Sequence, residues 1–254
     1  MFKNTSRACF FLLVTLLFSG CTTLYNPATG KNEFIIVDTD TEKSLGKNVV
    51  ADFRSKSKLD PDNKSQERIA QIGRRVAAVS ERKDIDYSFQ VLADKELNAL
   101  TLPGGYVFIN RGLVDKLNDD EIAYVLAHEV GHTAARHIAK KLQANMAYQL
   151  LAVVAFSSIG RSNAGVAADV ARGTNQVYEL VSLSYSRQDE FEADRLGVKY
   201  SSLAGFSPYA SLMALEKIKN NEGPRWKLLQ YFRTHPYVQD RIIALEEYIP
   251  KLKK

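Results

Sequence analysis

The chain has 254 residues, of which 45% are hydrophobic and 25% are charged, as in ordinary folded globular proteins. This length is sufficient for one sizeable hydrophobic core or two small ones. The formal charge of +5 is a small excess, and no basic stripe with interleaved aromatic residues accompanies it, so we expect no nucleic-acid partner.

The N-terminus has the pattern of a secretory signal. Lys3 and Arg7 form a basic start, and residues 8–18 form an apolar run. This run is too short for a transmembrane helix, which needs about 20 apolar residues, but it suits the core of a signal peptide. We therefore predict that residues 1–20 are a cleaved signal peptide of the lipoprotein type.

Cys21 follows small residues, as in a bacterial lipobox, whose cysteine is lipidated and becomes the new N-terminus. Phe18 departs from the leucine usual in that motif, so the alternative is an ordinary cleaved signal with an incidental cysteine. By resemblance to the sorting of Gram-negative lipoproteins, Thr22 implies a lipid-anchored protein on the periplasmic face of the outer membrane. Cys9, the other of the 2 cysteines, lies in the signal, so we expect no disulfide in the folded body.

The first part of the mature chain is expected to alternate between helix and strand. Two segments carry apolar residues at helical spacing, and three carry the alternation or the apolar clusters of strands. The predicted elements are an extended tether over 21–37, helices over 38–56 and 65–80, and strands over 87–91, 99–102 and 106–109. We therefore expect a small sheet of about three strands.

A long helix is predicted to begin at Asn118, because capping and acidic residues occupy its first turn. Its apolar residues form an unbroken row at four-residue intervals from Ile122 to Leu142, which indicates a buried, central helix. Residues 143–180 are interpreted as a mobile cover over a cleft, or as further helical packing. The remaining predicted helices cover about 186–203, 207–219 and 234–250.

The predicted central helix contains the sequence HEVGH at 128–132. His128 and His132 are four residues apart, so their side chains leave the same face of a helix and can bind one metal ion. Glu129 is rotated by about 100° from His128, where it can reach a water molecule on that ion as a general base. The alternative is a pair of core histidines satisfied by hydrogen bonds. His137, five residues further on, is rotated away from the ligand face and is expected at the surface or in a second layer.

The third ligand must come from elsewhere in the chain. Glu190 and Asp194 are four residues apart on a predicted helix, so Glu190 can ligate while Asp194 accepts a hydrogen bond from a ligand imidazole. Glu192 is the rival ligand but projects to another side, and an acidic helix surface is the alternative for the whole segment. Two histidines and a glutamate favour Zn²⁺, one ion per chain.

These motifs together resemble the gluzincin zinc metallopeptidase family of the CAAX prenyl protease and HtpX type. The resembling segments are HEVGH at 128–132, EFEAD at 190–194, Asn98-Ala99 with the following Pro-Gly-Gly, and Thr234-His235-Pro236 with Arg241. The periplasmic lipoprotein branch that includes BepA and LoiP is the most similar, although the chain ends too soon for the C-terminal repeat domain of BepA. The resemblance implies an α+β, mostly helical, zincin-like fold, with one metallopeptidase domain over 38–254.

The resemblance also implies roles for residues outside the metal motif. His235 stands at the predicted start of a helix and is the candidate oxyanion stabiliser, or else a helix-start histidine without a catalytic part. Arg241 orients this corner of the site or forms a structural ion pair. Asn98 and Ala99 belong to the strand whose edge would bind an extended substrate. Gly131, inside the motif helix, is expected to permit close approach of a neighbouring helix.

We therefore predict a zinc-dependent endopeptidase that acts on unfolded or misassembled periplasmic or outer-membrane proteins. The alternatives are a chaperone-like or latent metal-binding lipoprotein that assists outer-membrane protein assembly, and a metal hydrolase acting on a non-peptide bond. A sheet edge that is free to accept an extended chain would argue against the last of these.

Overall fold

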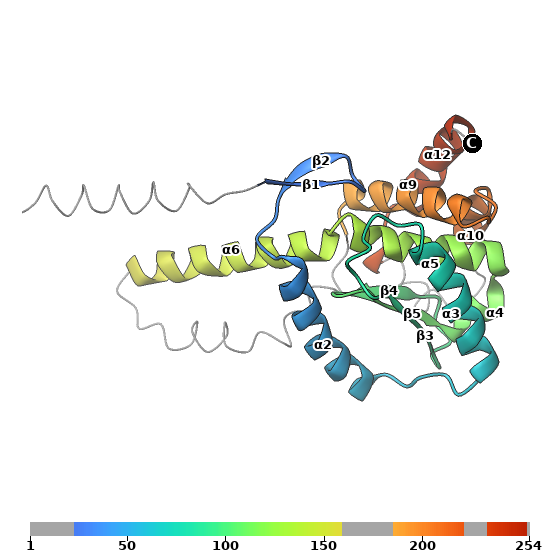
Figure 1. The fold of residues 1–254 in the computed structure, drawn as a ribbon, viewed down its shortest axis with the longest axis horizontal. Helices are drawn as coiled ribbons and strands as arrows, with labels where there is room; N and C mark the ends of the chain where they lie inside the picture. The colour runs from blue at the N-terminus through green and yellow to red at the C-terminus, as the bar shows by residue number, and fades with distance from the viewer. Residues whose placement is uncertain (1–22, 159–184, 221–232, 253–254) are drawn as a thin grey trace, which may run out of the picture.

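The computed structural model describes residues 23–158, 185–220 and 233–252, and helices dominate them (Figure 1). The predicted signal peptide and Cys21 lie outside these residues. The strands are β1 Thr23–Asn26, β2 Lys31–Phe34, β3 Ser88–Leu92, β4 Ala99–Leu102 and β5 Tyr106–Asn110. The helices are α2 Thr39–Lys56, α3 Asn63–Ala77, α4 Arg111–Lys116, α5 Asp119–Ala134, α6 His137–Ser158, α9 Arg187–Leu203, α10 Ala210–Lys219, α12 Val238–Tyr248 and the 3-10 turn η1 Ile249–Lys251.

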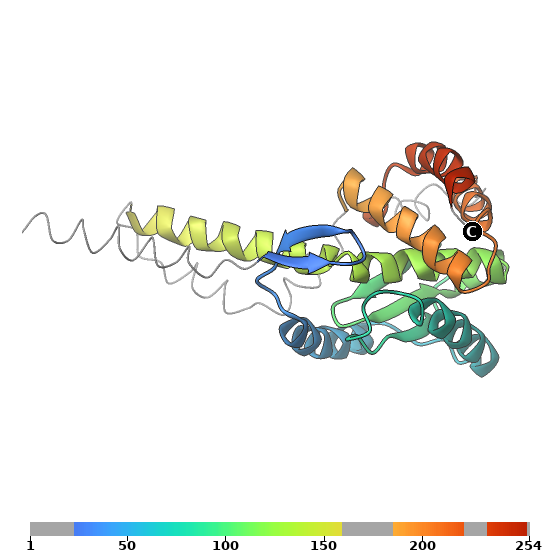
Figure 2. The ribbon, with the colours of Figure 1, turned by 45° about the horizontal axis from the view of Figure 1, so that its top comes forward.

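The segment predicted as a tether is a hairpin that docks on the body. β1 and β2 pair in antiparallel fashion, and Gly30 has a φ of 69°, which closes the turn between them. The buried Asn26 side chain donates to the Ala134 carbonyl at 3.1 Å, and Lys140 pairs with Glu33 at 2.8 Å. The hairpin therefore contacts the end of α5 and the start of α6, as Figure 2 shows.

The second sheet has the strand order β3-β5-β4, with β3 parallel and β4 antiparallel to β5. Successive side chains of these strands enter two hydrophobic clusters, because strand residues point alternately to the two faces of a sheet. Phe108 packs on Phe53 of α2 on one face, whereas Val107 and Ile109 face the cluster that contains α3 and α5 on the other. This layering places β4 at an edge of the sheet, beside α5.

Helix α5 begins as predicted. Asn118 caps it, accepting a hydrogen bond from the Glu121 backbone, while the Glu121 side chain accepts from the Asn118 backbone. The prediction that the helix continues to Leu142 is wrong, because α5 ends at Ala134 and Arg136 adopts a φ of 56°. This left-handed residue interrupts the helix before α6, which projects from the body in both views (Figures 1 and 2).

Helix α9 lies along α5, and two glycines make the approach close. A Cβ at Gly131 would meet the Ala193 carbonyl oxygen at 3.0 Å, which confirms the predicted use of this glycine. A Cβ at Gly197 would lie 3.1 Å from the His128 nitrogen. Ser186 caps α9 with Asp189, and the predicted helix over 186–203 is confirmed. Within the described residues, no helix has the length and apolar character needed to cross a membrane. The predicted cover at 143–180 lies mostly outside them.

Candidate metal centre

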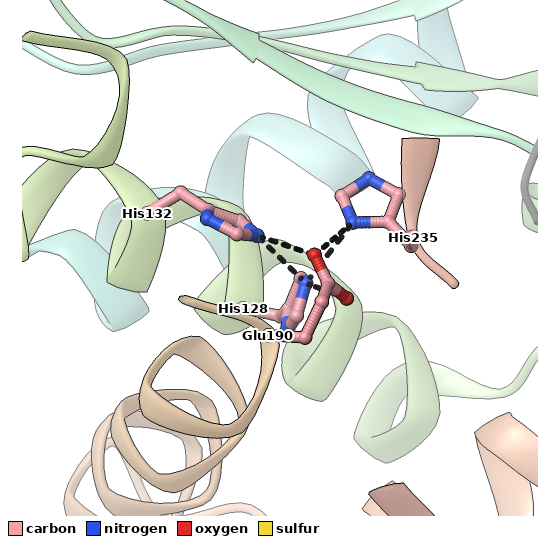
Figure 3. A group of neighbouring side chains, drawn as sticks. All are labelled: His128, His132, Glu190 and His235. Carbon is pink, nitrogen blue, oxygen red and sulfur yellow. Dashed lines mark hydrogen bonds and ion pairs between the residues drawn. The ribbon is translucent and has the colours of Figure 1, made fainter. Parts of the chain in front are cut away.

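Four buried side chains meet where α5 crosses α9 (Figure 3). His128 and His132 leave the same face of α5, with their Nε2 atoms 3.1 Å apart. Glu190, from the first turn of α9, places Oε1 at 3.3 Å from His132 Nε2 and Oε2 at 3.7 Å from His128 Nε2. Helix spacing predicted that His128 and His132 share a face, and the structure places Glu190, the candidate third ligand, beside both of them.

His235 is the fourth member of this cluster. Its Nδ1 lies 3.3 Å from His128 Nε2 and 3.1 Å from Glu190 Oε1. The prediction that it starts a helix is wrong, since α12 begins at Val238, after Tyr237 with a φ of 65°. His235 instead lies in the connection before α12, where the nearby carboxylates outweigh the opposing effect of burial and raise its pKa.

The donor atoms are close enough together to bind one zinc ion. Four atoms bound at 2.0–2.1 Å to a tetrahedral ion lie about 3.3–3.4 Å from one another, and the separations given above, which involve both oxygens of Glu190, range from 3.1 to 3.7 Å. Burial also lowers the pKa of His132 well below its usual value, which keeps that imidazole neutral and able to bind metal. Imidazole nitrogens and a carboxylate are ligands that zinc prefers.

The outer nitrogen of His128 is held by a carboxylate. Asp194, one turn after Glu190, lies 2.9 Å from His128 Nδ1 through Oδ1. Arg241 is fully buried and donates to both oxygens of Asp194, at 2.8 and 2.7 Å, and Tyr124 donates to Oδ1 at 2.7 Å. Burial alone would raise the pKa of Asp194, but the opposing effects of Arg241 and His128 hold it at about 2, so the carboxylate is ionised.

Arg241 also contacts the proposed ligand Glu190, with its Nη1 2.7 Å from Oε2. Burial acts to raise the pKa of Glu190, but Arg241 and His235 hold it well below the usual value. Arg241 therefore keeps two carboxylates ionised at once through ion pairs, which fit both alternatives predicted for it, an orienting role and a structural ion pair.

Glu129 lies beside the cluster, outside the set of converging ligand atoms. Its Oε1 is 3.4 Å from His235 Nε2, and its buried Oε2 makes no hydrogen bond within the part of the chain that the structure describes. Burial is the main cause of a raised pKa for this carboxyl group. The free oxygen is available to a water molecule or a substrate.

His137 is buried, so the surface position that was one of its two predicted alternatives is wrong. The break in the helix at Arg136 places His137 beside His132, with their Nδ1 atoms 2.8 Å apart. Glu192, the rival ligand, stays outside the cluster and contacts His137 Nε2 at 3.3 Å. The prediction from the sequence placed His137 by assuming an unbroken helix, and that assumption was wrong.

Tyr185 is a site residue that the sequence did not reveal. It precedes the α9 cap, and its ring stacks on His132 with centroids 3.7 Å apart. A single tyrosine before a helix carries no local signal of such a contact, because the contact joins segments about fifty residues apart in sequence.

Ala99 begins the edge strand β4 and Asn98 directly precedes it, and both lie outside the group of metal-binding candidates. The Asn98 carbonyl accepts from the Asn110 backbone at 2.9 Å, so by antiparallel alternation the backbone groups of Ala99 and Thr101 point away from β5. Asn98 is buried, and its Oδ1 has no hydrogen-bond partner among the described residues. No described strand pairs with this side of β4, but Ala99 and Thr101 are 0% and 1% exposed, so the edge is unpaired without being open to solvent.

A second buried ionic cluster lies near the C-terminal end of α5. Arg82 pairs with Glu42 of α2 at 3.0 Å and with Asp84 at 2.9 Å, and it donates to the Thr133 carbonyl at 3.2 Å. Arg136 completes the group, with Nη1 3.9 Å from Glu42. This cluster contains two carboxylates and two guanidinium groups, so its formal charges cancel.

The model of peptidase family M48 matches residues 63–249 of the chain. The mitochondrial metalloendopeptidase OMA1 of Schizosaccharomyces pombe is 30% identical over 89% of this chain and 66% of its own length. The beta-barrel assembly-enhancing protease of Escherichia coli K12 is 26% identical over 85% of this chain and 45% of its own, and a putative protease of the same name from Vibrio cholerae is 29% identical over 82% and 44%. The chain thus spans about two thirds of the first relative and under half of the other two.

Proposed function

Because the chain belongs to peptidase family M48 and is by that membership a zinc metalloendopeptidase, we propose that His128, His132 and Glu190 hold one Zn²⁺. The observation that carries this assignment is the convergence of three nitrogen and oxygen donors, close enough together to bind one zinc ion, in a buried site. Asp194 and Arg241 fix the orientation of His128 and Glu190, and so hold the donors in place before any metal binds.

Glu129 is the proposed general base. A zinc ion in this site supplies Lewis-acid chemistry, which polarises a carbonyl group and makes water a stronger acid. The free Oε2 of Glu129 takes a proton from the attacking water and later gives it to the leaving amine. The raised pKa of this carboxyl group suits both transfers, because a group that accepts and then returns a proton works best near the operating pH.

The substrate is proposed to bind as an extended chain on the unpaired edge of β4. The outward backbone groups of Ala99 and Thr101, which are buried, would have to be uncovered to form ladder hydrogen bonds with it, and the buried Asn98 would fix the start of this strand. Backbone pairing is independent of side-chain sequence, which suits an endopeptidase that acts on unfolded or misassembled proteins.

Two roles are compatible with the position of His235, and they predict opposite effects of His235→Ala on activity. If it stabilises the oxyanion, as the resemblance implies, His235→Ala lowers kcat. Its Nδ1 nevertheless lies among the metal donors, and four protein ligands are typical of a closed, structural zinc site. If His235 holds the fourth position in a latent form of the protein, His235→Ala raises the activity instead.

We further propose that the protein acts at the periplasmic face of a bacterial outer membrane, anchored through a lipidated Cys21. The lipobox-like sequence before Cys21 supports this location, and the bacterial relatives are named for enhancing β-barrel assembly. Mass spectrometry of the mature N-terminus tests it. An acylated Cys21 is expected, and an unmodified N-terminus at another residue would contradict the proposal.

The test of the catalytic assignment compares wild type with Glu129→Gln. General acid–base catalysis contributes about 10²- to 10⁴-fold, so cleavage of an unfolded protein such as casein should fall by that factor. The zinc content of both proteins, measured by mass spectrometry of the metal, should stay near one ion per chain. Equal activity of the two zinc-loaded proteins would contradict the assignment.

A further inference from the structure

The two metal-binding histidines of α5 differ in what holds their outer nitrogens. His128 Nδ1 lies against the Asp194 carboxylate at 2.9 Å. His132 Nδ1 lies against a second imidazole, that of His137, at 2.8 Å. Because a metal ligand's outer nitrogen needs a partner that fixes its tautomer and ring orientation, His137 occupies the place that a carboxylate takes for His128.

The polarity of the hydrogen bonds follows from the metal position. His132 presents Nε2 to the cluster, so a metal-bound neutral His132 carries its proton on Nδ1 and donates it to His137 Nδ1. His137 must then carry its own proton on Nε2. That nitrogen faces two carboxylates of α9, Glu192 Oε2 at 3.3 Å and Asp189 Oδ1 at 3.4 Å. Each N–H group in this series of hydrogen bonds therefore meets an acceptor.

Water has little access to the hydrogen bond between His132 and His137. His132 and His137 are both almost fully buried, and the Tyr185 ring covers His132 at 3.7 Å, so solvent has little access to the His132 Nδ1–H. The left-handed Arg136 produces this arrangement, because an uninterrupted helix would carry residue 137 about 140° away from His132. Arg136 is itself held by a hydrogen bond to Thr39 at 3.1 Å.

We propose that His137 is a positioning residue for the metal site, accepting the His132 Nδ1–H and passing the polarising effect of Glu192 and Asp189 on to that ligand. This proposal rests on the proposed function, in that it takes His132 as a zinc ligand. Substitution of such outer partners typically lowers metal affinity by about 10- to 100-fold.

The experiment measures zinc affinity by competition with a chelator, together with the visible spectrum of the Co²⁺-substituted protein. His137→Leu removes the acceptor, and we expect a loss of zinc affinity of about 10- to 100-fold and an altered Co²⁺ spectrum. His137→Asn places a carbonyl oxygen near the original Nδ1 and should restore much of the affinity. Glu192→Gln keeps the shape of the side chain that accepts from His137 but removes its charge, so it should lower zinc affinity by a smaller factor. This variant tests the proposal even if His137→Leu does not fold.

Lys31→Gln is the control, because Lys31 pairs with Glu192 from an exposed position and does not contact His137. Its zinc affinity should match that of the wild type. The proposal is overturned if His137→Leu or Glu192→Gln binds zinc as tightly as the wild type, or if His137→Asn is as impaired as His137→Leu. If the wild type itself binds no zinc, the proposed function fails, and this inference fails with it.

Discussion

Two polar clusters contact the C-terminal half of α5, and they differ in charge. The cluster around Arg82 contains two carboxylates and two guanidinium groups, whose formal charges cancel. The cluster at the α5–α9 crossing contains three carboxylates, from Glu129, Glu190 and Asp194, but Arg241 is its one guanidinium group. Its carboxylates therefore outnumber its guanidinium groups, although the raised pKa values of Glu129 and His235 both reduce the net negative charge.

This difference separates a structural ionic cluster from a candidate metal site. Buried charges are costly unless they are paired, so a buried excess of carboxylates over guanidinium groups favours a compensating cation. Zn²⁺ is such a cation, and the imidazole and carboxylate donors face the point where it would bind.

The largest expected effect comes from Glu190→Gln, which removes one of the three carboxylates. The variant loses a zinc ligand and part of the negative charge that attracts the cation, so peptidase activity should fall below about 1% of the wild type. Activity on casein and zinc affinity by chelator competition are the measurements. Retention of tight zinc binding would show that Glu190 is not a ligand.

Glu42→Gln is the matched change in the neutral cluster. It leaves the buried Arg82 without its carboxylate partner at 3.0 Å, so we expect a loss of about 3 kcal/mol in the free energy of unfolding. Zinc affinity should remain unchanged, because Glu42 contacts none of the metal donors. Urea denaturation and chelator competition on the same variant give both quantities. A large loss of zinc affinity would erase the distinction between the clusters.

Gly197→Ala tests the close packing on which the metal cluster depends. The added Cβ would lie 3.1 Å from the His128 nitrogen and 3.2 Å from its Cα, so α9 must shift by a few tenths of an ångström. Overpacking of this kind costs about 1–3 kcal/mol of stability, and displacement of Glu190 and Asp194 should also lower kcat. Thermal unfolding and steady-state kinetics measure the two effects. Wild-type values in both would show that the helix contact is more tolerant than the geometry implies.

Acid titration gives the smallest expected effect. Burial acts to raise the pKa of Asp84, but hydrogen bonds from Arg82 and Thr39 hold it at about 2, below the usual 3.8. The stabilisation is therefore complete above about pH 4 and is lost as the pH falls from 4 to 2. Since the Asp84 side chain is 43% exposed, the loss should not exceed about 1 kcal/mol. Asp84→Asn should abolish this part of the pH dependence, as measured by urea denaturation at several pH values.

The elements with strong local signals were predictable from the sequence. The capped start of α5, the capped start of α9 and the strands around Pro103-Gly104-Gly105 depend on residues close together in the chain. That His128 and His132 face one point was predictable because helix periodicity fixes which side chains share a face, whereas the approach of Glu190 from α9 depends on tertiary packing.

The remainder depends on contacts between distant residues or on one unusual backbone angle. Apolar periodicity continues through Arg136, so it conceals the left-handed residue that ends α5 and buries His137. The stacking of Tyr185 on His132 and the pairing of Arg82 with Glu42 depend on tertiary packing alone. Local propensity contains no information about either contact.

The most direct test of the central claim is a crystal structure of the zinc-loaded protein with anomalous diffraction measured above and below the zinc absorption edge. One anomalous peak is expected per chain, about 2.0–2.1 Å from His128 Nε2, His132 Nε2 and an oxygen of Glu190. Absence of a peak at the α5–α9 crossing, or a peak beside the neutral Arg82 cluster, would contradict the assignment of the metal site.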